Sequence, residues 1–107
     1  MTKMTIRCES FKPYRRNTLY GFCEIIIAEL QLHIKDVALH QKGSSRWAQL
    51  PAKPQIKDGV IVKDDAGKAQ YIAIMEFSGR DVRDAFSAAA INAVLERAPN
   101  AFDDDTP

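Results

Sequence analysis

Strand-like alternation of apolar and polar residues runs through most of this chain, and helical spacing begins only near its end. Five segments rich in β-branched and aromatic residues are separated by turn residues: 4–11, 19–30, 32–40, 46–50 and 70–77. Short turns join the first four segments, so we expect these to pair as antiparallel neighbours. The fifth is apolar on both faces and is expected to lie centrally. This order predicts the α+β class, with a curved antiparallel sheet of four to five strands followed by one C-terminal helix.

The segment at residues 32–40 contains one break in its alternation. Two pairs of apolar residues in it have opposite parity: Leu32 with Ile34, and Val37 with Leu39. In a regular strand one of these pairs would face water. An extra residue inserted near the middle returns both pairs to one face, so the sequence predicts a β-bulge at Lys35 and Asp36.

Helical spacing begins after Ser78, a residue type that favours the N-cap, and Asp81 three residues later resembles a capping box. A first apolar stripe is expected to cover the sheet: Val82, Phe86, Ala89, Ala90, Ala93 and Val94. A second apolar stripe consists of Ala88, Ile91 and Leu95. Because a helix with two apolar sides has a second surface to bury, we expect these three residues to form a homodimer interface.

Length and composition fit one globular domain. The chain has 107 residues, of which 46% are hydrophobic and 27% are charged, as in ordinary domains. Pro99 ends the helix, so we expect the domain to span residues 1–98 and residues 99–107 to form a disordered acidic tail. Residues 51–69 are rich in turn residues, and within them 60–62 are expected to pair with 70–77. An excursion of this length is typically mobile or functional.

Several classes of protein and of site are disfavoured. No C-x-x-C pair contains Cys8 or Cys23, and apolar runs such as residues 25–28 are far too short to cross a membrane. We expect a cytoplasmic protein with reduced cysteines. His33 and His40 lack a third metal ligand unless Asp36 joins them, and no nucleophile or phosphate-loop motif accompanies them. We therefore expect no metal, cofactor, small-molecule substrate or catalytic residue.

Positive charge gathers in the first part of the chain. Residues 1–63 carry 11 Lys and Arg and 5 acidic residues, whereas residues 64–107 carry 4 and 9. Such asymmetry is typical of a surface that faces a polyanion, and it also arises by chance in small domains. We predict a non-catalytic protein that binds DNA or RNA through seven residues: Lys42, Arg46, Lys53, Lys35, Arg15, Arg16 and Trp47. The alternative is a homodimeric module that binds a partner protein by strand addition or helix packing.

Trp47, the single tryptophan, admits two interpretations. If Ala48 and Leu50 face the core, then Trp47 lies on the outer face, where it can stack on an unpaired base. If Trp47 faces the core instead, it is a packing anchor, which is the commoner role of a lone tryptophan. The alternation of the strand at residues 46–50 is compatible with both.

The order of segments resembles the stage V sporulation protein G (septation regulator) family of small bacterial proteins over residues 19–95. Two motifs carry the resemblance: residues 32–37 (LHIKDV), similar to an apolar strand with a basic-Asp-apolar step, and residues 46–53 (RWAQLPAK), similar to a strand ending in Met-Pro-Ser-basic. The resemblance implies a nucleic-acid-binding homodimer. The family's His-Pro step before the helix is replaced by residues 77–80 (FSGR), and the loop at residues 54–69 is longer. The outline is also similar to dimeric single-stranded-DNA-binding coactivators.

Overall fold

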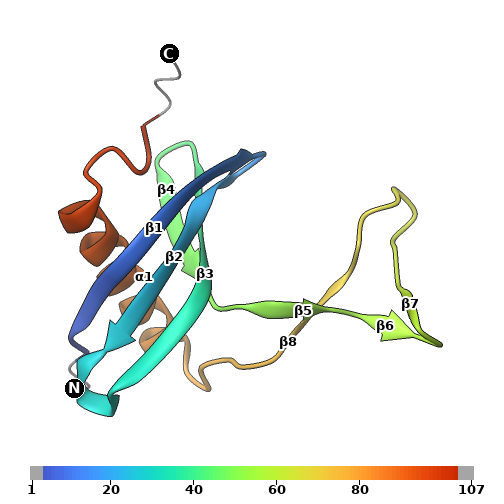
Figure 1. Cartoon of the computed structure of the whole chain (residues 1–107), viewed down its shortest axis with the longest axis horizontal. Helices are drawn as coiled ribbons and strands as arrows, with labels where there is room; N and C mark the ends of the chain where they lie inside the picture. The colour runs from blue at the N-terminus through green and yellow to red at the C-terminus, as the bar shows by residue number, and fades with distance from the viewer. Residues whose placement is uncertain (1–3, 104–107) are drawn as a thin grey trace.

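The computed structural model of this protein describes residues 4–103 and contains a four-stranded antiparallel sheet with a helix across one face (Figure 1). Its strands pair in chain order: β1 (Ile6–Arg16), β2 (Leu19–Ile27), β3 (Leu32–Lys42) and β4 (Ser45–Gln49). A 3-10 turn, η1 (Ala28–Leu30), joins β2 to β3, and the helix α1 (Arg80–Arg97) lies near the C-terminus. The predicted class, an antiparallel sheet followed by one helix, is confirmed.

The core lies between the sheet and α1. The central strands β2 and β3 contribute Ile25, Val37 and Leu39, and α1 contributes Phe86 and Val94, all with at most 1% of their surface exposed. The helix contacts both β1 and β4, which are the two edges of the sheet, so it crosses the whole face. Burial of the apolar helix stripe against a curved sheet is the main stabilising contribution in a domain of this size.

The β-bulge predicted at Lys35 and Asp36 is confirmed. The β2–β3 register shifts between the pairs Cys23–Val37 and Ile25–Ile34, so β3 contains an extra residue at this point. Asp36 has φ of 60°, a left-handed conformation that Asp adopts more readily than most residues. The apolar residues on both sides of the bulge consequently share the core face: Ile34, Val37 and Leu39 are buried, while Leu32 at the strand end is 42% exposed.

Gly21 allows β1 and β2 to approach closely. A Cβ at this position would lie 2.5 Å from the backbone oxygen of Lys12 and 2.6 Å from Cε1 of Phe11. Backbone atoms cannot move aside without breaking the strand pairing, so any larger residue at position 21 displaces β1. The aromatic ring of Phe11 fills the space that a side chain would need.

Three element boundaries differ from those predicted. β1 was expected to end before Pro13 but continues to Arg16, because β1 is an edge strand and the missing N–H of proline is tolerated there. Residues 28–30, expected to extend β2, form η1 instead. The N-cap of α1 is Gly79, not Ser78, and no side chain caps the first turn.

The chain between β4 and α1 leaves the sheet as a narrow projecting ribbon, which we call the arm (residues 52–73; Figure 1). In the arm, β5 (Ala52–Pro54) pairs with β8 (Tyr71–Ala73), and β6 (Ile56–Lys57) pairs with β7 (Val60–Ile61). The prediction that residues 70–77 lie centrally in the sheet is therefore wrong. Their predicted pairing with residues 60–62 is met only at one point, where the backbone N–H of Gln70 donates to the oxygen of Val62 at 2.9 Å, because β7 pairs with β6 and β8 with β5. Apolar residues on both faces of that segment indicated burial, yet no neighbouring strand of the described chain covers them.

The segment after α1 is more ordered than predicted. Residues 99–107 were expected to be disordered, but Ala101 and Phe102 are 8% and 3% exposed and belong to the core. The apolar ring of Phe102 explains the difference, since it lies 5.7 Å from the ring of Tyr20. Residues 104–107 lie outside the described part of the chain.

Candidate nucleic-acid interface

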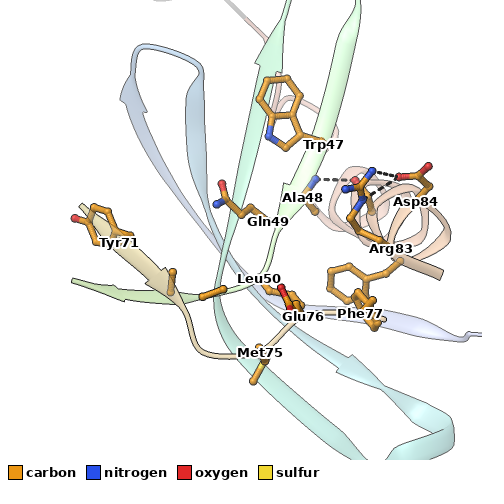
Figure 2. Close-up of a pocket in the computed structure, with 14 residues that line it drawn as sticks. Trp47, Ala48, Gln49, Leu50, Tyr71, Met75, Glu76, Phe77, Arg83 and Asp84 are labelled. Atoms are coloured by element: carbon orange, nitrogen blue, oxygen red, sulfur yellow. Dashed lines mark hydrogen bonds and ion pairs between the residues drawn. The ribbon is translucent and has the colours of Figure 1, made fainter. Parts of the chain in front are cut away.

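The sheet has one face under α1 and one face without a helix, which we call the open face. Ala48 and Leu50 pack against the core, and the backbone N–H of Ala48 donates to Oγ of Ser87 in α1 at 2.8 Å. Trp47 therefore points to the opposite side, as the close-up of β4 shows (Figure 2). Of the two interpretations of Trp47, the structure supports the outer position.

Strand pairing places further residues on the open face beside Trp47, because side chains directly opposite one another on paired strands share a face. Three rows of such residues cross the sheet: Arg16, Leu19, His40 and Trp47; then Lys12, Phe22, Ala38 and Gln49; then Arg7, Ile26 and His33. Lys42 has the same parity as His40 at the end of β3. The first two rows lie nearest the β1–β2 and β3–β4 turns.

Two aromatic pairs occupy this part of the open face. The rings of His40 and Trp47 stack with centroids 5.3 Å apart and planes inclined by 6°, and those of Tyr14 and Phe22 lie 6.1 Å apart at 53°. Partial burial lowers the pKa of His40, which a hydrogen bond from the imidazole to the side chain of Gln49 partly offsets. The imidazole is therefore uncharged near neutral pH, so the stack is a neutral aromatic surface.

Basic side chains surround these rings. Lys12, Arg16 and Lys42 in this part of the face are exposed, as is Arg7 in the third row, and residues 10–23 and 37–57 contain no Asp or Glu. Glu24 pairs with Ser10 between the second and third rows of this face, and its carboxylate lies 3.4 Å from Nδ1 of His33. The first two rows thus carry positive charge and contain no carboxylate.

The seven residues predicted to contact nucleic acid fall into separate groups. The open face brings together Arg16, Lys42 and Trp47, and Lys35 lies at the bulge of β3. Arg15 and Arg46 lie toward the helix side, with their guanidinium groups over the rings of Tyr20 and Phe102 at 3.7 and 4.7 Å. Lys53 belongs to β5 in the arm. The expectation that all of them converge on one surface is not met.

Sequence reasoning missed Arg7, Lys12 and Phe22 and treated His40 only as a possible metal ligand. Alternation along β1 and β2 decides which of their residues lie on the open face. This alternation can be followed from the sequence only where the register shifts are known. Two such shifts interrupt β1, between Cys8 and Ser10 and between Pro13 and Arg16. Without them, the face of each β1 residue is ambiguous.

The helix residues predicted to form a dimer interface do not share one exposed surface. Ile91 is 8% exposed and belongs to the core of its own chain, and Leu95 is half-buried and packs against that core. Ala88 is exposed. The second apolar stripe is thus mostly used within the chain, since the sheet is wide enough to cover it.

No group of three or more His, Cys, Asp or Glu side chains within residues 4–103 could hold a metal ion, and His33, His40 and Asp36 do not gather. Cys8 and Cys23 are free thiols. Burial raises the pKa of Cys23 to about 12, so this thiol stays protonated and is a poor nucleophile. In the described residues α1 lacks the apolar content that a membrane-crossing helix needs.

A hollow of about 620 Å³ lies where the arm meets the body (Figure 2). Its lining includes Leu50 just after β4, Tyr71 in β8 and Met75 between β8 and α1. α1 contributes Arg83 and Asp84, which form an ion pair at 3.3 Å. Apolar side chains and this ion pair thus line the hollow together.

Comparisons of the chain with models of protein families, with curated protein sequences and with solved structures find no match. The resemblance to the septation regulator family stays a prediction.

Proposed function

We propose that this protein binds single-stranded nucleic acid on the open face of its sheet and catalyses no reaction. The observation that carries the proposal is the pair of aromatic contacts, His40 with Trp47 and Tyr14 with Phe22, on a face bordered by exposed Lys and Arg. Two free cysteines suit a cytoplasmic setting, where thiols stay reduced.

Unpaired bases suit this face better than a duplex does. A sheet surface with exposed aromatic rings binds bases whose π-faces are accessible, and each stacked base contributes about 1 to 3 kcal/mol. Phosphates between the bases would reach Lys12, Arg16 and Lys42 around the rings. Because the His40 ring is uncharged near neutral pH, electrostatic attraction is supplied by these Lys and Arg side chains, and binding should weaken as salt rises.

Trp47→Ala is expected to weaken binding to a labelled oligo(dT) or oligo(U) strand by about 5- to 150-fold, the equivalent of one lost base stack. Fluorescence anisotropy in low salt measures the affinity, with a duplex of the same length for comparison. The tryptophan is half-buried on a face away from the core, so the substitution should leave the fold intact.

Tyr71→Ala is the matched control, since Tyr71 is an aromatic residue of the arm that is 65% exposed. It should leave single-strand affinity unchanged. Equal binding of single strands and duplexes, together with an unchanged affinity of the Trp47 variant, would show that bases do not stack on the open face.

A second candidate function is self-association through the arm. Seven of the ten exposed large hydrophobic residues found among residues 4–103 lie between positions 56 and 75: Ile56, Val60, Ile61, Tyr71, Ile72, Ile74 and Met75. A two-stranded ribbon is marginally stable alone, and an exposed apolar patch of this kind usually marks a protein interface. We propose that the arm pairs with a second copy of the chain to form a homodimer.

Ile56→Thr with Ile61→Thr tests this second candidate. The two residues are paired across β6 and β7 and are 63% and 44% exposed, so threonine costs a monomer little. If the pair is buried between two copies, the dimer dissociation constant should rise at least about tenfold. Sedimentation velocity over a concentration series measures it, with Leu30→Thr, a 68% exposed residue of η1, as the control. A wild-type chain that sediments as a monomer at all concentrations contradicts the proposal.

A further inference from the structure

We infer that two copies of the chain associate by pairing β8 with β8 in antiparallel orientation, about a two-fold axis at Ala73. The inference rests on the second candidate function, because it concerns which part of the arm holds the copies together. β5 and β8 form a two-stranded ribbon (Figure 1), so within the described residues each strand has one edge without a neighbour. These two outer edges differ in the backbone groups and side chains that they present.

Backbone polar groups alternate along β8 between the β5 side and the outer edge. The N–H of Gln55 donates to the oxygen of Gln70 at 2.7 Å. Pairs two residues apart in an antiparallel ladder have the same orientation, so Ile72 also directs its backbone groups toward β5. The N–H and C=O groups of Tyr71 and Ala73 therefore point to the outer edge, where another strand could bind them.

The outer edge of β5 is blocked by proline. Ala52 pairs with Ala73 and Pro54 pairs with Tyr71, so Ala52 and Pro54 hold the outward positions of β5. Pro54 has no N–H to donate, and Pro51 precedes the strand directly. Proline at a sheet edge is one of the features that prevent the addition of a further strand. β8 contains no proline, so its edge is the one at which a strand can add.

The side chains of β8 and of the residues beside it are uncharged and largely apolar. Residues 69–75 contain no Lys, Arg, Asp or Glu, although 27% of the whole chain is charged. Exposed fractions along this segment are 65% for Tyr71, 43% for Ile72, 52% for Ile74 and 43% for Met75. Edge strands that remain unpaired usually carry charged residues or proline. This edge instead has the composition of a strand that a neighbour covers.

An axis at Ala73 matches apolar side chains across the two copies. It places Ala73 opposite Ala73 of the second copy, Ile72 opposite Ile74, and Tyr71 opposite Met75. The outward backbone groups of Tyr71 and Ala73 then face outward groups of the other copy, as a hydrogen-bonded antiparallel pair requires. The same patch is used by both copies, so the interface closes at a dimer and leaves no further β8 edge for a third chain.

The apolar area of the arm is close to what a stable dimer needs. In the antiparallel arrangement the tip of each arm lies toward the base of the other arm, so the second copy can also cover Ile56, Val60 and Ile61. The arm has seven exposed apolar side chains between positions 56 and 75. If each buries about 60 to 120 Å², a copy loses roughly 400 to 800 Å² of exposed surface, against about 800 Å² per partner in a standard interface.

Ala73→Pro tests the pairing directly. It removes an N–H that points to the outer edge and leaves the hydrogen bonds between β5 and β8 unchanged, so the arm should still form. We expect the dimer dissociation constant to rise at least about tenfold in sedimentation velocity. The matched control is Ala52→Pro, which changes the residue paired with Ala73 at the outer edge of β5. This control should keep the dissociation constant within about twofold of wild type, a small fraction of the tenfold step.

Ala73→Cys tests the pairing without removing a backbone donor. At the axis the two Cα atoms of residue 73 would lie about 5.5 Å apart, within the range that a disulfide spans. Oxidation with copper(II) phenanthroline should therefore give a covalent dimer on a non-reducing gel. In Ala52→Cys the two substituted positions would be three strand spacings apart, about 15 Å, and no such dimer should form. The wild-type chain, with Cys8 and Cys23 alone, gives the background.

The two measurements together decide the inference. A covalent dimer with Ala73→Cys and not with Ala52→Cys supports it, as does a weaker dimer with Ala73→Pro alone. A wild-type dimer that Ala73→Pro does not weaken and that Ala73→Cys does not crosslink overturns it and leaves self-association through another part of the arm standing. If both proline variants weaken the dimer equally, the crosslink decides. A wild-type chain that is monomeric at all concentrations contradicts the second candidate function and the inference with it.

Discussion

Phe86→Ala is expected to lower the free energy of unfolding by about 3 to 5 kcal/mol, a large part of the stability of a domain of this size. Phe86 is 1% exposed and is the largest of the fully buried side chains. Its ring lies 5.1 Å from that of Phe77, which precedes α1, so the substitution also removes the contact that ties the start of the helix to the base of the arm. Urea denaturation followed by circular dichroism measures the loss.

Two further substitutions separate cavity formation from other effects. Phe86→Leu keeps most of the apolar volume and should cost less than about 1.5 kcal/mol if the core repacks around it. Tyr71→Ala removes an aromatic ring that is 65% exposed, and it should change stability by no more than about 0.5 kcal/mol. A cost below about 1 kcal/mol for Phe86→Ala would mean that α1 does not cover the sheet as described.

Sequence reasoning predicted the fold correctly where the alternation of apolar and polar residues was compatible with only one arrangement of the strand. The bulge in β3 is the clearest case, because only an extra residue near Asp36 returns Ile34 and Val37 to one face. The arm was assigned wrongly for a related reason. Apolar residues on both faces of residues 70–77 indicate that something covers them, but they do not say whether it is the same sheet or another molecule.

The candidate site was harder to predict than the fold because a site depends on which residues share a face. Arg15 and Arg16 are adjacent in sequence, so they point to opposite sides of β1, and grouping them as one basic pair ignored this period of two. The face of Lys12 depended on register shifts in β1 that have no counterpart in the residue pattern. Trp47 was left undecided until Ala48 and Leu50 were found against the core.

Residues 99–103 are ordered after α1 for a physical reason that the amino-acid composition of the segment does not indicate. A run of three aspartates dominated the prediction of disorder for residues 99–107, while the single ring of Phe102 received no weight. Burial of a phenylalanine side chain contributes about 1.5 to 3 kcal/mol, which offsets the backbone entropy of ordering about one or two residues. Phe102 thus fixes this segment beside β2, where its ring packs against that of Tyr20.

Lys12→Ala, Arg16→Ala and Lys42→Ala together are expected to weaken single-strand binding by roughly 100-fold at about 50 mM salt, because three phosphate contacts and their released counterions are lost. The three side chains are exposed on the open face around Trp47 and Phe22 and form no ion pair with another of residues 4–103, so their removal should leave stability nearly unchanged. The slope of log affinity against log salt should become shallower by about two, since each single-strand contact contributes about 0.7.

The arm supplies the matched control for this triple variant. Lys53→Ala, Lys57→Ala and Lys63→Ala remove three equally exposed positive charges that lie away from the open face. If general attraction to a polyanion were enough, both variants would lose affinity and salt dependence to the same extent. If the open face is the interface, the arm variant should keep a salt slope within about 0.7 of wild type. A loss confined to the arm variant would move the interface from the sheet to the arm.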